Sequence, residues 1–520
     1  MSSQREGAVA IVRALRRAGR EAFFVGGCVR DLLRGEEPDD YDVVTSARPE
    51  QIMEIFPKTY PVGAAFGVIL VREGGHNYEV AAYRKETDYR DGRHPSRVSF
   101  ATAREDVYRR DFTVNGLLMD PETGEIVDYV GGRADLEKKV IRTIGPPEER
   151  FAEDHLRMLR AVRFAANLGF LIEKATLEAI RFHGEKINRV SAERLREELG
   201  RILTGPGPRR GMELLAETGL LTRLLPEVAA LRGVDQPPRF HPEGDVWEHT
   251  LRMLALLPQE RIPREGMGRL AWAVLFHDAG KPATRTEDEK GIHFYGHVPR
   301  GVEIAARALK RLKFSREDTE AVLALVANHM RFMHVREMRP HTLKKFLRQP
   351  DFELHLALHR LDCLGSHGNL DNEAFCRGRL GELTAAELPP PAPHGRRSHR
   401  PGVFPRSGVP EDPGHDRRRP TPRRDHLPGR SPRLGQEDVF ANCCRRRSWM
   451  RREAILLPPR PTRIATSVRS SALNSTSKIT FSPWMTACRR ALPILTVFSL
   501  PAACISFKMS SMARQTVSKG

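Results

Sequence analysis

The feature that most constrains the fold is a change of hydrophobic period near residue 140. Before it lie short β-prone runs at residues 22–25, 41–44, 68–71 and 78–83. Gly, Pro or charged residues separate these runs, which is typical of strands. From Ile141 to about Leu383 apolar residues recur at helical spacing instead. The sequence predicts an α+β protein: a mixed α/β head opened by an amphipathic helix over residues 1–20, then an all-α remainder.

The net charge of +19 lies in the C-terminal segment. Residues 394–520 hold 25 of the 85 Lys and Arg but 7 of the 66 Asp and Glu, so residues 1–393 hold 60 basic and 59 acidic side chains. Bulk charge therefore gives no argument for nucleic-acid binding by the globular part, where local grooves would have to supply the attraction.

The segment 389–520 has no sustained period and is rich in Arg, Pro and Ser. Natural disorder, a basic RNA-binding tail and a frameshift near residues 389–393 all fit this composition. We favour the frameshift, because a GC-rich gene read in the wrong frame gives such a composition. Translation of the other two frames would test it.

Cysteine usage and the absence of targeting signals predict a cytoplasmic protein. The seven cysteines are far apart except for Cys443 and Cys444, without a zinc-type pair or a disulfide framework. Residues 1–20 lack the apolar core of a signal peptide. The apolar stretch 491–507 contains two prolines and is shorter than the roughly 20 residues that cross a bilayer. No membrane partner is expected, and the oligomeric state stays open.

The head contains a candidate nucleotidyl-transfer group. Gly26 and Gly27 end the first strand, where the missing side chains let a triphosphate approach backbone amides. Asp40 and Asp42 are two apart on a predicted strand and so face the same way. Such carboxylates repel each other unless a cation lies between them, and their oxygens suit Mg²⁺. Glu79 is the candidate third acid.

Metal ions held by paired carboxylates can clamp the attacking and leaving oxygens of a phosphoryl displacement. A Gly-Gly pair alone is usually a turn, and Asp-x-Asp is usually a solvated strand edge. In this order they resemble the nucleotidyltransferase superfamily that includes DNA polymerase β, which implies that fold for residues 1–140.

Four further segments sharpen the resemblance. They are Arg-Arg-Asp-Phe-Thr-Val-Asn at 109–115, Asp-Tyr-Val-Gly-Gly-Arg-Ala-Asp-Leu at 128–136, the run 153–164 beginning Glu-Asp-His-Leu-Arg, and Ser-Ala-Glu-Arg-Leu at 191–195. They resemble class II tRNA nucleotidyltransferases and bacterial poly(A) polymerases. The resemblance implies template-independent, Mg²⁺-dependent addition of CMP and AMP from CTP and ATP to the tRNA 3′ end.

The family motifs imply a set of nucleotide-binding residues. They are Gly26, Gly27, Arg30, Arg110, Asp111, Asn115, Asp154, Arg157, Arg160 and Arg163. Arg110, Asp111 and Asn115 belong to the segment that recognises the ribose in the family. A helix cap for Asp111 and a surface ion pair for Arg110 are the structural alternatives.

Asp154 and Arg157 are three apart, so on a helix they would share a face. A carboxylate accepts hydrogen bonds and a guanidinium donates them. Cytosine and adenine both present an amino donor beside a ring-nitrogen acceptor, whereas guanine and uracil present the reverse and would leave charges unpaired. The pair is thus a candidate protein template for C and A. An ordinary helix salt bridge is the alternative.

Three features bear on the subclass. The polar segment 83–98, with Gly92 and Pro95, predicts a mobile loop, and the family associates a loop here with adding the terminal A. Residues 63–71 resemble the CCA-adding version of their strand. His155 replaces the small residue usual in the template motif, which leaves a poly(A) polymerase or an A-adding enzyme as the alternative.

A second group of histidines and aspartates follows in the helical part. His249, His277, Asp278 and Asp362 match the core pattern of the HD phosphohydrolase superfamily, and His297 and His329 extend it to a two-metal site. Imidazole with carboxylate suits a divalent metal, of a kind the sequence does not identify, that lowers the pKa of bound water. A purely structural metal is the alternative, and some family members hydrolyse 2′,3′-cyclic phosphates or 2′-nucleotides.

These patterns predict a nucleotidyltransferase head at 1–140, a helical body for base selection and RNA binding at 141–232, an HD domain at 233–388 and the tail at 389–520. A function of another class also fits the sequence: an HD phosphohydrolase whose head only binds RNA.

Overall fold

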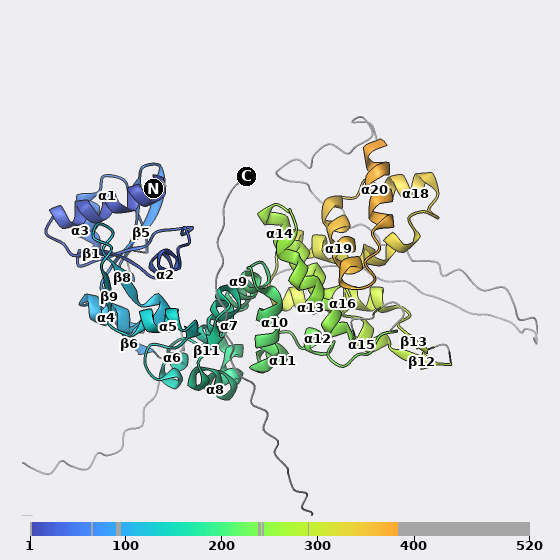
Figure 1. Ribbon diagram of the computed structural model, residues 1–520, viewed down its shortest axis with the longest axis horizontal. Coiled ribbons are helices and arrows are strands. Elements are labelled where there is room, and N and C mark those ends of the chain that lie inside the picture. The colour runs from blue at the N-terminus through green and yellow to red at the C-terminus, as the bar shows by residue number, and fades with distance from the viewer. Residues whose placement is uncertain are drawn as a thin grey trace, which may run out of the picture. The chain divides into compact units, whose positions relative to one another are not determined.

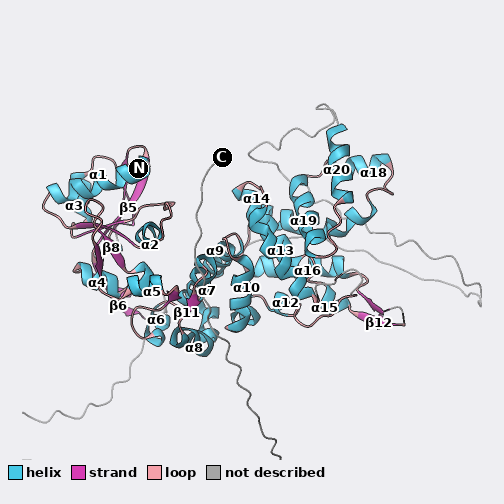
Figure 2. Cartoon of the chain, viewed as in Figure 1, coloured by secondary structure: helices cyan, strands magenta, loops and turns pink. Residues whose placement is uncertain are grey.

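The computed structural model describes residues 3–63, 66–89, 95–237, 241, 244–289 and 291–382. Within this part of the chain, strands gather in the N-terminal head and helices make up most of the rest (Figures 1 and 2). The predicted α+β class, with a mixed head and a helical remainder, is confirmed. The tail at 389–520, with Cys443 and Cys444, lies outside the described residues.

A seven-stranded sheet organises the head. Its strands are β1 (Ala22–Val25), β2 (Val43–Thr45), β3 (Thr59–Gly63), β4 (Val68–Glu73), β5 (His76–Ala82), β8 (Leu117–Met119) and β9 (Ile126–Asp128). Their spatial order is β3-β4-β5-β2-β1-β8-β9. Only β2 and β5 pair in parallel, with Val43 opposite Val80, and the other neighbours are antiparallel. The central strands β1 and β2 consist of apolar residues except for Thr45, and all of their residues but Phe23 are buried.

Alternate residues of the central strands supply two separate cores, because successive side chains point to opposite faces. Phe24 and Val43 pack with the apolar residues of α1 (Ser3–Arg17), α2 (Gly27–Leu33) and α3 (Pro49–Ile55). Val25 and Val44 pack with Val107 of α4 (Ala103–Tyr108) on the other face. In Figure 1, α1 and α3 lie on the same side of the sheet.

The segment predicted as a mobile loop forms two paired strands, β6 (Arg84–Tyr89) and β7 (Pro95–Phe100), with Arg84 opposite Phe100. Polarity and turn residues alone do not predict this hairpin, because it depends on pairing between residues up to 16 positions apart, such as Arg84 and Phe100. The residues between the strands, with Gly92, lie outside the described part.

The helical body follows α5 (Gly132–Glu137) and a short parallel pair, β10 (Val140–Ile141) with β11 (Leu171–Ile172). Its elements are α6 (Pro147–Glu153), α7 (Leu156–Leu168), α8 (Lys174–His183), η3 (Gly184–Arg189), α9 (Ala192–Leu203), α10 (Pro208–Glu217), α11 (Leu220–Leu224) and α12 (Pro226–Ala229). Helix α7 is buried around most of its circumference and ends at Gly169, whose φ of 67° fits a glycine C-cap.

The remaining described residues form further helices and one small hairpin. These elements are α13 (Val246–Leu256), η4 (Leu257–Gln259), α14 (Arg264–Phe276), α15 (Lys281–Thr284), β12 (Thr286–Asp288), β13 (Gly291–His293), α16 (His297–Arg311), α17 (Arg316–Asn328), η5 (His329–His334), α18 (Pro340–Leu347), α19 (Phe352–Gly365) and α20 (Asp371–Glu382). One apolar core runs from the body into α13, α14, α17 and α19. In the described part of the chain, no helix is long and apolar enough to span a bilayer.

Two glycines give a test of this packing. A Cβ on Gly132 would lie 2.1 Å from the carbonyl oxygen of Thr113, so backbone must move. Gly200, inside α9, has nothing within 4 Å of its Cβ position. We expect Gly132→Ala to lower the free energy of unfolding by about 1–3 kcal/mol, because overpacking is destabilising. Gly200→Ala should raise it by up to about 1 kcal/mol.

Urea unfolding of the two variants beside the parent chain measures both effects. Destabilisation by both substitutions would contradict this account of α9, and a neutral Gly132→Ala would contradict the close approach at Thr113.

Candidate functional site

The turn after β1 brings together a glycine, an arginine and an aspartate. Gly26 has a φ of 78°, in the left-handed region that favours glycine, and precedes α2. A Cβ there would lie 3.6 Å from Nη1 of Arg110 and 4.0 Å from Oδ2 of Asp42. Gly27 similarly approaches Nη2 of Arg30 at 3.6 Å. The two glycines thus leave space in front of charged side chains.

Strand β2 begins at Val43, so Asp40 and Asp42 precede the strand on which the sequence predicts them. The backbone at Asp42 still extends the pairing, because its carbonyl oxygen accepts from the N–H of Val25 at 3.1 Å. Glu79 lies on the neighbouring strand β5, whose Val80 is opposite Val43. The pairing therefore places Asp42 beside Glu79 at one end of the parallel pair.

The three carboxylates interact through their charges. Burial, together with the charges of Asp40 and Glu79, raises the pKa of Asp42 to about 7, although Arg110 acts in the opposite direction. Among the described residues, the groups of three or more ligand atoms within 4.8 Å of one another come from the predicted HD domain, so Asp40, Asp42 and Glu79 do not form such a group. A hard cation bound between the head carboxylates would relieve their mutual repulsion.

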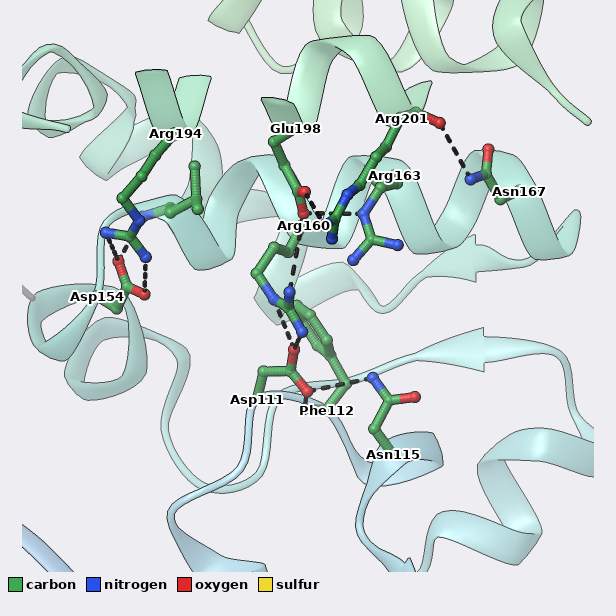
Figure 3. Close-up of polar contacts among 11 residues, drawn as sticks. Asp111, Phe112, Asn115, Asp154, Arg160, Arg163, Asn167, Arg194, Glu198 and Arg201 are labelled. Carbon is green, nitrogen blue, oxygen red and sulfur yellow. Dashed lines mark hydrogen bonds and ion pairs between the residues drawn. The ribbon is translucent and has the colours of Figure 1, made fainter. Parts of the chain in front are cut away.

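A continuous chain of polar contacts joins the head to the helical body (Figure 3). Nη1 of Arg30 donates to Oδ1 of Asn115 at 2.8 Å, and Nδ2 of Asn115 donates to Oδ1 of Asp111 at 3.2 Å. Nε and Nη2 of Arg160 donate to Oδ2 of Asp111 at 2.8 and 2.5 Å. On its other side Arg160 faces Glu198, which also accepts from Nε of Arg163 at 2.8 Å.

The ring of Phe164 lies within this chain of contacts. The guanidinium carbons of Arg30, Arg160 and Arg163 are 5.5, 5.2 and 4.1 Å from its centroid. Phe164 also packs edge-on against Phe112 at 5.7 Å. Three cations share one ring, so the arginines predicted from the motifs converge on one region from two different elements, α2 and α7.

Burial of Asp111 is compensated by this network. Burial raises the pKa of Asp111, but the guanidinium of Arg160 and the Asn115 hydrogen bond outweigh it and hold the pKa at about 2. Asp111 also accepts from the N–H of Phe112 at 2.8 Å. A plain helix cap therefore does not describe Asp111, and the ion pair of Arg110 is formed with the buried Asp106 at 3.0 Å and is not a surface pair.

Asp154 and Arg157 do not share a helix. Asp154 is the C-cap of α6 in an extended conformation, and Arg157 lies in the first turn of α7. Nη1 and Nη2 of Arg194 donate to the two oxygens of Asp154 at 3.2 and 2.7 Å, whereas Arg157 pairs with Glu153 at 2.6 Å. The expected shared helical face is wrong, because His155 and the break between α6 and α7 separate the two.

Glu153, Arg194 and Glu198 were missed as site residues by the sequence reasoning. Arg194 and Glu198 are four apart on α9, so both point toward α7. The sequence could have indicated Glu153 and Arg194, because both stand inside the motif segments. The burial of Glu198 is visible only in the structure. Only the fold shows that they hold Asp154, Arg157, Arg160 and Arg163.

The histidines and aspartates of the HD part converge as predicted. His249, His277 and Asp362 form one group of ligand atoms within 4.8 Å, and Asp278, His297 and His329 form another. They come from the separate elements α13, α16, η5 and α19 and from the turn after α14, which contains His277 and Asp278. Nε2 of His249 is 3.1 Å from Oδ1 of Asp362, and Nε2 of His277 is 3.1 Å from Oδ2 of Asp278.

Three of these imidazoles are oriented for metal binding. Nδ1 of His277, His297 and His329 lies 2.7–2.8 Å from the backbone carbonyl oxygens of Val274, Phe294 and Val326. Nδ1 therefore carries the proton, and the Nε2 atoms present their lone pairs to the group. Nε2 of His277 faces Oδ2 of Asp278, and the buried Nε2 atoms of His297 and His329 have no hydrogen-bond partner, at 3.8 and 3.9 Å from Oδ1 of Asp278. Acceptor nitrogens that face carboxylate oxygens in this way fit a divalent cation.

Comparison with known families places three regions of the chain. Residues 22–142 match the family described as "Poly A polymerase head domain", residues 169–231 match "Probable RNA and SrmB- binding site of polymerase A", and residues 246–352 match "HD domain". The matched regions contain the head carboxylates, α9 and most of the histidine cluster.

A curated CCA-adding enzyme of Anoxybacillus flavithermus is 38% identical over 316 residues, which cover 60% of this chain and 73% of that protein. The chain belongs to the CCA-adding enzyme family. The family's member from Geobacillus thermodenitrificans is 47% identical over 218 residues, 42% of this chain and 54% of its own length. The chain is thus a tRNA nucleotidyltransferase that also has an HD domain.

A solved structure gives the same family assignment. The CCA-adding enzyme of Bacillus stearothermophilus in complex with CTP superposes with a TM-score of 0.57 at 30% identity, over 74% of this chain and 84% of that one. A tRNA-processing enzyme in an apo form superposes with a TM-score of 0.52 at 20% identity, over 72% of this chain and 97% of that one. The latter shows a shared fold.

The buried Asp111 predicts a pH-dependent stability difference. Its pKa in the folded protein lies below its ordinary value of 3.8, so its stabilisation is present above pH 3.8 and is lost as the pH falls toward 2. We expect Asp111→Asn to cost roughly 2 kcal/mol of unfolding free energy at pH 7. That cost should shrink between pH 4 and pH 2 in urea unfolding.

Glu122→Gln is the control for this experiment, because Glu122 pairs with Arg13 at the surface and should show a much smaller cost. A cost for Asp111→Asn that does not change between pH 4 and pH 2 would contradict the proposed pairing with Arg160.

The histidine cluster predicts a measurable metal content. Protein equilibrated with Mn²⁺ and then gel-filtered should retain metal by mass spectrometry and should melt at a higher temperature than chelator-treated protein. His329→Ala should lose the retained metal. His355→Ala is the matched control, since His355 is also buried but belongs to neither ligand group. Equal metal retention by both variants would refute the site.

Proposed function

We propose that the head residues carry out the transfer of CMP and AMP from CTP and ATP to the 3′ end of tRNA. The observation that carries this assignment is the meeting of Gly26, Arg110 and the carboxylate of Asp42 beside the network of Asp111 and Arg160. A glycine turn next to acidic and basic side chains can receive a triphosphate on one side and a cation on the other.

In this reaction the 3′-hydroxyl oxygen of the RNA forms a bond to the α-phosphorus, and the bond to the pyrophosphate group breaks. Asp40 and Asp42, with Glu79 nearby, would hold Mg²⁺, which supplies charge neutralisation and activation of the hydroxyl. Arg110 remains close enough to Asp42 to contact a phosphate there, and Arg30 orders Asn115. Arg110, Asp111 and Asn115 are the proposed ribose-binding residues.

Asp154 and Arg157 are the proposed base-selecting pair. Arg194 occupies one acceptor position on each oxygen of Asp154, and a carboxylate has about four such positions, so Asp154 can still accept from the amino group of cytosine or adenine. Glu153 and the carbonyl oxygen of Arg109 orient Arg157. Arg160 and Arg163, fixed by Glu198, would line the same nucleotide site.

The proposed domain boundaries remain 1–140, 141–232 and 233–388, supported by family matches at 22–142, 169–231 and 246–352. The frameshift origin of 389–520 remains a proposal. We also place the activity in the cytoplasm, since Cys28, Cys363 and Cys376 are buried free thiols.

Incorporation of labelled nucleotides into a tRNA lacking CCA tests the activity. CTP alone should add C, and CTP with ATP should complete CCA. Asp42→Ala should abolish both additions, whereas Asp39→Ala, at an exposed neighbouring acid, should retain them. Failure to add C would favour the poly(A) or A-adding alternative, and unchanged addition by Asp42→Ala would revive an RNA-binding head without transferase chemistry.

We propose a second activity, metal-dependent phosphoester hydrolysis, for the HD part. It is supported by the two facing ligand groups at the edge of a cavity. Water oxygen would form the new bond to phosphorus as the bond to the ester oxygen breaks, and the leaving alcohol takes up a proton. A structural role of the metal would instead give binding and stabilisation without hydrolysis.

A further inference from the structure

A cavity of about 360 Å³ opens beside the metal-binding histidines of the HD part. Its lining includes Asp278, His297, His329 and Asp362 and also the aromatic side chains of Phe294 and Tyr295. Its volume falls in the range of small-molecule sites, which combine apolar lining with a few convergent polar groups. The phosphohydrolase proposal uses only the polar residues and leaves the aromatic lining unexplained.

Two of the aromatic rings that line the cavity form a stack. The rings of His293 and Tyr295 lie 5.2 Å apart with an interplanar angle of 15°. The β12–β13 hairpin fixes His293 opposite Thr286, and Nε2 of His293 lies 3.0 Å from Oδ1 of Asp288. The platform is therefore held by backbone pairing and by a carboxylate.

The outer member of the stack is exposed to an unusual degree. Tyr295 is 78% exposed although one face rests on His293, and Met333 is 60% exposed. Among the described residues they are two of the four most exposed large apolar side chains, and both line this cavity. Exposed apolar side chains that gather at a cavity mark a binding surface.

We infer that Tyr295, stacked on His293, binds the nucleobase of the HD substrate, so that the phosphoester lies toward Asp278 and Asp362. The ligand class is a nucleoside monophosphate or the terminal nucleotide of an RNA. A planar base extends an existing parallel stack, whereas an aliphatic or peptide ligand gains little from it. Lys281, buried with Nζ 2.7 Å from Oδ2 of Asp278, adds positive charge on the phosphate side.

This inference rests on the proposed phosphohydrolase activity and adds a specificity. Stacking tolerates any base, because every base has a π face. The site should therefore prefer nucleotides to base-free phosphoesters and discriminate little among the four bases. Tyr295 acts in binding and not in the chemical step.

The test uses the full chain loaded with Mn²⁺ and measures hydrolysis of the four nucleoside 2′-monophosphates and of glycerol 2-phosphate, a secondary phosphoester without a base. We expect Tyr295→Ala to raise KM for all four nucleotides about 10-fold, the size of one stacking contact. Its kcat, and its activity on glycerol 2-phosphate, should stay unchanged. Tyr295→Phe should behave as the parent chain, since the ring remains.

The matched control is Tyr60→Ala, at an exposed tyrosine of β3 in the head. An unchanged KM in Tyr295→Ala, or equal losses with glycerol 2-phosphate, would overturn the inference. Loss in Tyr295→Phe equal to that in Tyr295→Ala would assign the effect to the hydroxyl and would also overturn it.

Equilibrium dialysis separates this inference from the hydrolase proposal. Adenosine 2′-monophosphate should bind the metal-loaded parent chain more tightly than Tyr295→Ala, with Tyr295→Phe unchanged, whether or not the ester is hydrolysed. If the parent chain hydrolyses nothing but shows this difference, the hydrolase proposal fails and the platform stands. Equal binding by parent and Tyr295→Ala refutes the platform. CMP addition to tRNA serves as the check that each variant is folded.

Discussion

The ion pair between Asp111 and Arg160 is the contact on which the arrangement of the proposed nucleotide site depends. Asp111 follows α4 in the head, and Arg160 lies on α7 of the helical body. Through Asn115 the pair reaches Arg30 on α2, and through Glu198 it reaches Arg163 and α9. A buried pair of this kind is costly if one partner is removed, because the other charge is left uncompensated. The head and the body are thereby tied by charge at the place where a nucleotide would have to contact both.

Two aspartates of the head have opposite electrostatic environments. Asp111 is surrounded by donors, and its pKa is held at about 2. Burial, together with the charges of Asp40 and Glu79, raises the pKa of Asp42 to about 7. The first environment stabilises a permanent charge, and the second stores repulsion that a bound cation would relieve. This contrast separates the structural carboxylate from the ones proposed to hold Mg²⁺.

In the HD domain, histidine side chains take part in the proposed cation site beside the aspartates. Backbone carbonyl oxygens fix the tautomer of His277, His297 and His329, so their Nε2 atoms are presented to a common space. The adjoining cavity is also lined by the stacked rings of His293 and Tyr295, which belong to neither group of potential metal ligands. The proposed metal ligands and the proposed base-binding rings come from different elements, so substitutions could alter binding and chemistry separately.

The sequence by itself determined the α+β class and identified the six histidines and aspartates that the structure brings into two close groups, because both are encoded in local period or in motif spacing. It also predicted the paired acids of the head and the motif arginines as site residues. It predicted Asp154 and Arg157 on one helical face, and it treated residues 83–98 as a loop. The tertiary structure corrected both, since a helix break at His155 and the pairing of β6 with β7 depend on contacts that short-range spacing does not encode. Only the tertiary structure decided that Arg194 and Glu198 contact Asp154, Arg160 and Arg163, and that Tyr295 lines the same cavity as Asp278 and Asp362. The physical reason is that these contacts join residues far apart in the chain, and tertiary packing, which sequence period does not encode, decides which of them lie together.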